Sequence, residues 1–103
     1  MDKFLSFLGI VRKSGNLEVG YNKCEEAIKR NELSLVIVSL DASDNTLKKF
    51  NNYALKYNTR IIHDFKEEIL GTSLGYDSIK VVGIKNRRMS RNLISIYDTD
   101  SKK

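Results

Sequence analysis

The spacing of hydrophobic positions changes several times along the chain and predicts short strands alternating with amphipathic helices. Apolar side chains three or four residues apart indicate a helix, whereas a β-branched run or a strict alternation indicates a strand. By this criterion, helices are expected at residues 2–13, 21–30, around 47–57, in a short stretch through Leu70, and at about 88–97. Strands are expected at residues 17–19, 34–40, 60–63 and 79–84.

The longest apolar run, LSLVIVSL at residues 33–40, indicates a strand that is covered on both faces. Residues 41–44 (DASD) then offer cap residues for the next helix, and Asp64 is placed to cap the short helix through Leu70. Strands that alternate with helices predict an α/β fold, a three-layer α/β/α sandwich with a mixed sheet of about four strands. We expect a single domain at residues 1–98 and a frayed polar tail at 99–103.

The composition is that of a small globular protein. Hydrophobic residues make up 41% of 103 residues, which is enough for a core without disulfides or metal. No apolar run approaches the roughly 20 residues of a membrane helix, and the first six positions do not resemble a secretory signal. The single cysteine, Cys24, suggests a reducing compartment. We therefore expect a cytoplasmic protein that does not enter membranes.

The positive charge is concentrated near the C-terminus. Residues 1–78 contain 11 basic and 11 acidic side chains, so the net charge of +5 comes from residues 79–103. Arg87, Arg88 and Arg91 lie in that segment. A local basic surface attracts polyanions, although it is also compatible with a solubilising tail.

Residues suited to catalysis are few. His63 lies at the end of a predicted strand beside Asp64, and adjacent residues on a strand point to opposite faces. Cys24 lies on the apolar face of a predicted helix, where a free cysteine usually behaves as a small buried hydrophobe. One cysteine and one histidine do not make an ordinary zinc site, and glycine-rich nucleotide motifs are absent. We expect no catalytic residues, no metal, no cofactor and no enzymatic activity.

Residues suited to binding gather at the start of the second predicted helix. Gly20 precedes it and allows another backbone to approach closely. The first turn of a helix presents unpaired N–H groups that favour phosphate. Asn22 and Lys23 lie in that turn, where an amide can contact a base edge or sugar and an ammonium can contact phosphate. An ordinary helix start with solvated polar side chains is the alternative.

Four stretches together resemble the kink-turn RNA-binding ribosomal proteins of the L7Ae and L30e type, and among them the small bacterial YlxQ-like proteins. They are FLSFLGIVRKSGNLEVGYNKCEEAIKR, LVIVSLDASDNT, the segment ending in YNTRII, and LGTSLGYDSIKVVGI. The likeness covers roughly residues 3–85. Its most specific parts are KSGNLEVG, LDASDNT and LGTSLG, in this order and spacing.

The resemblance implies an RNA site with no catalytic group. In the family, the RNA-contacting segment follows a glycine and begins Asn-Glu, with a lysine three residues later. Gly20 and Asn22 match, whereas Lys23 stands where glutamate is usual and Glu26 where lysine is usual. The supporting loop corresponds to Asp41 and Ala42, and the loop that covers flipped-out nucleotides to residues 75–79. The site residues implied in these two loops, with the following lysine, are Asp41, Ala42, Gly75, Tyr76, Ser78, Ile79 and Lys80.

Within the second loop, Ile79 is expected to make the apolar contact. Outside the matched region, Arg87, Arg88 and Arg91 are expected to add attraction to RNA that does not depend on its sequence. The predicted function is binding of kinked or bulged structured RNA, such as a kink-turn or ribosomal RNA, by a monomer associated with ribosomes; DNA is not expected. The alternative is a protein-interaction module on the same scaffold without RNA binding.

Overall fold

The computed structural model describes residues 2–101, which form five helices and four strands. In chain order they are α1 (Asp2–Lys13), β1 (Leu17–Val19), α2 (Tyr21–Lys29), β2 (Leu35–Val38), α3 (Asp44–Tyr57), β3 (Arg60–Ile62), α4 (Glu67–Ser73), β4 (Val81–Ile84) and α5 (Arg87–Ser101). Each element expected from the hydrophobic spacing is present. No helix among these residues is long and apolar enough to span a bilayer.

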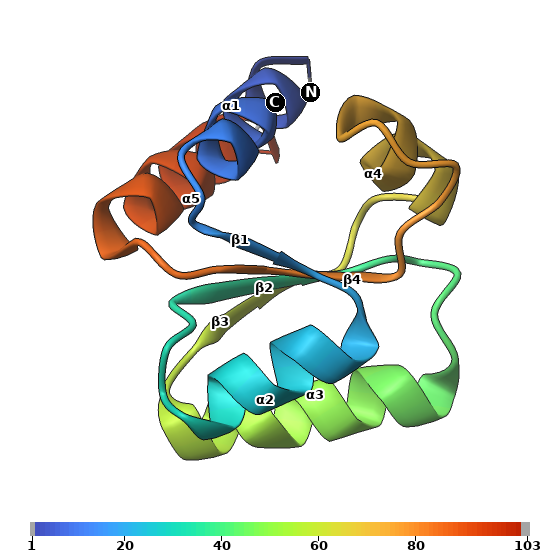
Figure 1. The fold of residues 1–103 in the computed structure, drawn as a ribbon, viewed down its shortest axis with the longest axis vertical. Coiled ribbons are helices and arrows are strands. Elements are labelled where there is room, and N and C mark those ends of the chain that lie inside the picture. The colour runs from blue at the N-terminus through green and yellow to red at the C-terminus, as the bar shows by residue number, and fades with distance from the viewer. Residues whose placement is uncertain (1, 102–103) are drawn as a thin grey trace.

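The strands form one mixed sheet in the order β1-β4-β2-β3. Strand β4 is antiparallel to both β1 and β2, whereas β2 and β3 are parallel. Helices α2 and α3 cover one face of the sheet, and α1, α4 and α5 cover the other (Figure 1). The three-layer α/β/α sandwich with a mixed four-stranded sheet is therefore confirmed.

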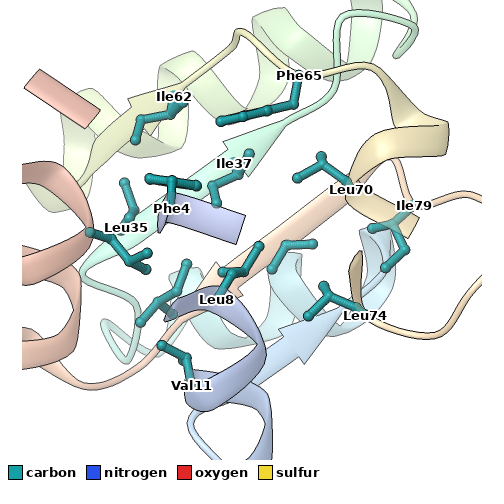
Figure 2. Packing of buried hydrophobic residues seen from close by; sticks show 13 residues of the cluster. Phe4, Leu8, Val11, Leu35, Ile37, Ile62, Phe65, Leu70, Leu74 and Ile79 are labelled. Carbon is teal, nitrogen blue, oxygen red and sulfur yellow. The ribbon is translucent and has the colours of Figure 1, made fainter. Parts of the chain in front are cut away.

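The side chains of β2 are buried on both sides of the sheet, as its unbroken apolar run predicts. Leu35 and Ile37 pack towards α1, α4 and α5 in the larger core cluster, which Figure 2 shows from close by. Val36 and Val38 pack towards α2 and α3 in the smaller one. Cys24 is buried in the smaller cluster with Ala27 and Ile28, as expected from its helical face.

The short helix near residue 70 begins later and has a different cap than predicted. It was expected to follow Asp64 and end at Leu70, but α4 spans Glu67–Ser73. The Asp41 carboxylate accepts a hydrogen bond from the backbone N–H of Glu67 at 2.8 Å. Lys66 occupies the N-cap position without a capping side-chain hydrogen bond. Asp41, in the loop between β2 and α3, therefore caps α4 from outside the helix by accepting from its first N–H.

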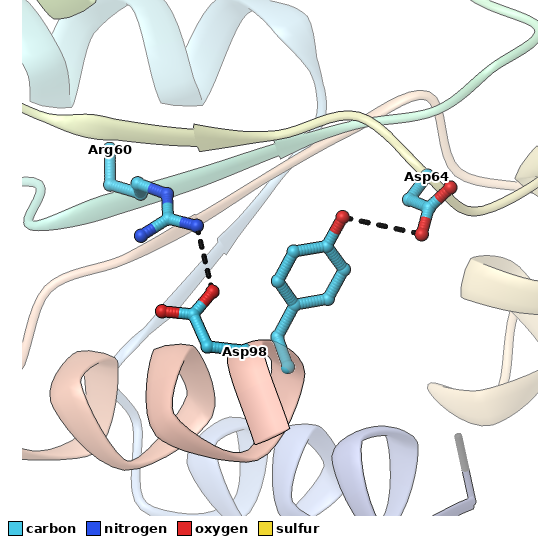
Figure 3. A network of polar contacts seen from close by, with 4 residues as sticks. Arg60, Asp64 and Asp98 are labelled. Atoms are coloured by element: carbon cyan, nitrogen blue, oxygen red, sulfur yellow. Dashed lines mark hydrogen bonds and ion pairs between the residues drawn. The ribbon is translucent and has the colours of Figure 1, made fainter. Parts of the chain in front are cut away.

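The last helix is also longer than predicted, because its end is attached to the edge of the sheet. It was expected to end near Tyr97, yet α5 continues to Ser101. The Arg60 guanidinium on β3 donates to Asp98 at 3.0 Å, and the Tyr97 hydroxyl donates to Asp64 at 3.3 Å (Figure 3). Residues 102–103 of the predicted tail lie outside the described residues.

Candidate nucleic-acid interface

Three segments that are distant in sequence meet at one end of the sheet. Because β4 is antiparallel to β1 and β2, the start of β4 lies beside the ends of the other two strands. The Gly20 N–H donates to the Val81 carbonyl at 2.9 Å, and the Ser39 N–H donates to the Lys80 carbonyl at 2.8 Å. The start of α2, the β2–α3 loop and the chain before β4 therefore lie together, on the right of Figure 1. We call this end of the molecule the α2 end.

The start of α2 leaves polar groups available to a ligand. Gly20 has φ 103° and ψ 158°, a conformation that favours glycine, and no side chain caps the first turn. Asn22, Lys23 and Glu26 are exposed. Among the described side chains of residues 3–99, none of these three forms a hydrogen bond or ion pair. The first turn therefore offers backbone N–H groups, an amide and an ammonium to the same region of solvent.

The loop at residues 75–79 is held firmly against α4. The N–H of Tyr76 donates to the Gly71 carbonyl at 2.8 Å, and that of Ile79 to the Glu67 carbonyl at 3.0 Å. Gly71 also allows a very close approach, since a Cβ there would lie 2.5 Å from the Cα of Ser78. The loop thus has a fixed position relative to the helix.

The β2–α3 loop supports this arrangement through Asp41. Because its carboxylate caps α4, it also fixes the helix on which the 75–79 loop rests. The Ala42 N–H donates to the Ser39 carbonyl at 3.2 Å, and the Ala42 side chain packs against the smaller core cluster. Both residues therefore stabilise the α2 end through contacts with α4 and the smaller core cluster, although Asp41 remains exposed to solvent.

Tyr76 supplies the exposed aromatic surface of the loop. Its side chain is 42% exposed, and the Arg12 guanidinium lies 5.5 Å from its ring centroid. Gly75 has φ 84°, so the chain turns there before the tyrosine. Arg12 was not among the expected site residues, because nothing in its spacing indicates that the last turn of α1 reaches this loop. A cation over an aromatic face provides a flat surface suited to stacking.

The expectation for Ile79 was wrong. Its side chain is 4% exposed and packs in the larger core cluster, so it is not available to touch a ligand. The apolar residue ends the loop by anchoring it to the core, and the exposed ring of Tyr76 takes the outward position. Ser78 and Lys80 are exposed, and the Lys80 ammonium lies 4.0 Å from the Glu67 carboxylate.

The C-terminal arginines do not join this group. Arg87, Arg88 and Arg91 lie in the first two turns of α5, which begins just beyond the carboxyl end of β4. The α2 end lies at the other end of that strand, and the two regions appear on opposite sides of Figure 1. The structure therefore divides the predicted site residues into two groups.

The residues considered for catalysis are engaged elsewhere. The Cys24 thiol is 3.5 Å from the Glu18 carbonyl, and burial, with a smaller contribution from the Glu18 carboxylate, raises its pKa to about 12. The His63 Nδ1 lies 3.1 Å from the Val38 carbonyl. Among the residues that the structure describes, no three His, Cys, Asp or Glu side chains are grouped as metal ligands would be.

The surroundings of Cys24 do not activate it. A thiol whose pKa is raised stays protonated at neutral pH, and the protonated form is a poor nucleophile. The catalytic reading of this residue has no support in its environment.

Comparison with known proteins places the chain in a family. The model of the ribosomal protein L7Ae/L30e/S12e/Gadd45 family matches residues 2–94. The chain is 25% identical over 96 residues to the RNA-binding protein YlxQ of Bacillus subtilis (strain 168), covering 93% of this chain and 96% of that protein.

Solved structures are similar over the same length. A protein of unknown function from Bacillus halodurans C superposes with a TM-score of 0.89 at 29% identity, covering 93% of this chain and 97% of the other. The 15.5kD RNA binding protein of Giardia lamblia superposes with a TM-score of 0.76 at 15% identity, covering 88% of this chain and 78% of the other. The match to the family model extends over nearly the whole chain, and the protein belongs to the ribosomal protein L7Ae/L30e/S12e/Gadd45 family.

Proposed function

We propose that the α2 end binds structured RNA that is kinked or bulged, and that the protein acts in the cytoplasm as a monomer on ribosomal or similar RNA. The observation that carries this proposal is the first turn of α2. Its N–H groups, Asn22 and Lys23 are unpartnered within residues 2–101 and lie beside a loop that the fold holds in place. The names of the Bacillus subtilis relative and the Giardia structure, both RNA-binding proteins, support the same ligand.

Each group at the α2 end has a chemical role in this proposal. The helix start and Lys23 hold phosphate, since N–H groups and an ammonium both favour an anion there. The Asn22 amide hydrogen-bonds a base edge. Glu26 lies three residues after Lys23 on the same helix face, where its carboxylate accepts from a base amino group. The paired surface of Arg12 and Tyr76 stacks on a base that has left the helix.

Kinked or bulged RNA suits this surface better than a regular duplex. The narrow major groove of an RNA helix hides base edges, whereas a bulge exposes both their edges and their faces. The α2 end offers groups of both kinds: an amide and a carboxylate for base edges and a ring for a base face. A plain duplex uses only the phosphate contacts.

The experiment compares Asn22→Ala with the wild type on a kinked RNA and an unkinked duplex. Loss of a base-edge contact costs about 1–3 kcal/mol, so affinity for the kinked RNA should fall roughly 5- to 150-fold while duplex affinity changes little. Asn51→Ala, an exposed asparagine on α3, is the matched control and should bind as the wild type does. An unchanged preference for the kinked RNA in Asn22→Ala would show that the site is misassigned. If the wild type binds neither RNA at low salt, the protein-interaction function replaces this one.

A further inference from the structure

The end of the molecule opposite the α2 end contains an open groove of about 960 Å³. It lies between the turn that joins α2 to β2, the end of α3 and the first turns of α5. Hydroxyl, amide and cationic groups line it. They come from Asn31, Ser34, Asn58, Lys85, Arg87 and Arg91.

Two guanidinium groups in this groove have no counter-ion among the side chains that the structure describes. Arg87 and Arg91 are exposed, and being four residues apart in α5 they lie on one face of the helix. Neither forms an ion pair or a side-chain hydrogen bond with the described side chains of residues 3–99, whereas Lys85 is paired with Glu18 at 2.8 Å. Glu32 is the acidic residue among those that line the groove. The groove therefore carries an uncompensated positive charge.

The arrangement of these arginines is unfavourable in the free protein. Arg88 precedes Arg91 by three residues, so three like charges lie close together on the first two turns. Like charges at this spacing repel one another, and the first turn of α5 contains no acidic residue. An anion in the groove would relieve this repulsion, and a guanidinium binds phosphate oxygens with two parallel hydrogen bonds.

The start of α5 does not itself supply the site. The Asn86 side chain already caps it by accepting from the Met89 N–H at 2.9 Å. The donors that remain are the guanidinium groups and the polar lining of the groove.

The groove is too far from the α2 end to serve the same phosphate groups. Strand β4 alone separates them by four residues, or about 13 Å at roughly 3.3 Å per residue. The whole molecule measures only 29 × 28 × 27 Å. A ligand held at one end therefore leaves the other end open to a different segment.

We propose that this groove beside α5 binds the phosphodiester backbone of a second RNA segment without reading its sequence, so that one protein molecule bridges two RNA segments. This inference deepens the proposed function, because it takes RNA as the ligand of the α2 end.

The test measures energy transfer between a donor on a kinked RNA and an acceptor on a separate plain duplex, with the full chain present. The wild type should bring the two together. Arg87→Gln with Arg91→Gln should abolish the transfer and keep kinked-RNA affinity within about twofold. The same double variant should lower affinity for the plain duplex by roughly tenfold per lost phosphate contact at 0.1 M salt. It should also reduce the slope of log affinity against log salt concentration by up to about two.

Two further variants separate the possible outcomes. Lys3→Gln with Lys48→Gln removes the same charge from exposed positions on α1 and α3 and should keep the transfer. Asn22→Ala should weaken the kinked RNA alone. Thermal unfolding of each variant checks that it is folded.

The inference is overturned if the double arginine variant behaves like the double lysine variant. It is equally overturned if the arginine variant weakens both RNAs in parallel, which would indicate one continuous site. If the wild type binds the kinked RNA but shows no energy transfer, the groove does not bind a second RNA segment, and the proposed function of the α2 end still stands. If the wild type shows transfer or duplex binding but does not prefer the kinked RNA, the proposed function of the α2 end is wrong, and the role of the groove in binding RNA still stands.

Discussion

Substitution of Gly71 tests whether the loop at residues 75–79 is held as the structure shows. Gly71 lies inside α4 and its absent side chain makes room for the next part of the chain. A Cβ at this position would lie 2.5 Å from the Cα and 2.7 Å from the N of Ser78, and 2.9 Å from the carbonyl carbon of Asp77. All three are backbone atoms, so a rotamer change cannot relieve the contact.

The expected magnitude is the difference between two opposing effects. Alanine is favoured over glycine inside a helix by about 1 kcal/mol, which alone would stabilise the variant. Overpacking typically costs about 1–3 kcal/mol, and a clash with backbone should fall towards the upper limit because the whole loop must shift. Gly71→Ala should therefore lower the free energy of unfolding by about 1–2 kcal/mol. For a chain of this length, each kcal/mol corresponds to roughly 4–8 °C in Tm.

The assay compares Gly71→Ala with Gly9→Ala by thermal and denaturant unfolding. Gly9 lies inside α1, and a Cβ there would meet nothing within 4 Å, so this control should be stabilised by up to about 1 kcal/mol. The two variants share one chemical change and have opposite expected signs. Stabilisation of Gly71→Ala equal to that of Gly9→Ala would refute the reasoning. Weaker binding of kinked RNA by Gly71→Ala alone would further connect the loop position to the proposed site.

Two other predictions concern local features of the fold. Cys24 should react slowly with thiol reagents at pH 8 and quickly after denaturation, because it is buried. Its pKa is raised from 9.0 to about 12, so the folded state keeps the thiol protonated at pH values where the unfolded state has lost the proton. Its contribution to the free energy of unfolding should therefore fall as pH rises from about 9 towards 12, an effect absent in Cys24→Ala; rapid native labelling would contradict the burial. Ser43→Ala should cost about 1 kcal/mol in thermal unfolding, since the Ser43 hydroxyl accepts from the Thr46 N–H at 3.1 Å and caps α3, whereas the exposed Ser95→Ala should change little.

The elements and layers of the fold could be predicted because they follow from local spacing. The unbroken run through β2 indicated burial on both faces, and all four of its residues are buried. The alternation in residues 17–19 correctly predicted β1 despite its short length. Such signals depend on neighbours in the chain, which the sequence displays directly.

The details that failed depend on contacts between distant residues. Asp64 was a reasonable cap by position, but the cap of α4 comes from Asp41 in another loop. Ile79 was expected to face a ligand because residues 75–79 resemble the family loop that covers flipped-out nucleotides, yet its side chain is buried in the core beside the strand that follows. Arg12 was overlooked because its partner, Tyr76, lies far along the chain. Only the folded arrangement shows which residue completes each contact.

The charge distribution along the chain gives the clearest case of this limit. Counting residues located the excess positive charge after residue 78, and the resemblance located the RNA site partly in residues 75–80. The two regions are adjacent in sequence, so a single basic binding surface was the natural interpretation. Strand β4 lies between them and carries the chain across the sheet, from Lys80 at one end to Arg87 at the other. A strand places its flanking residues at opposite ends of a domain, so nearness in sequence across β4 predicts separation in space, and this separation is why we propose a second RNA segment as the ligand of the arginines.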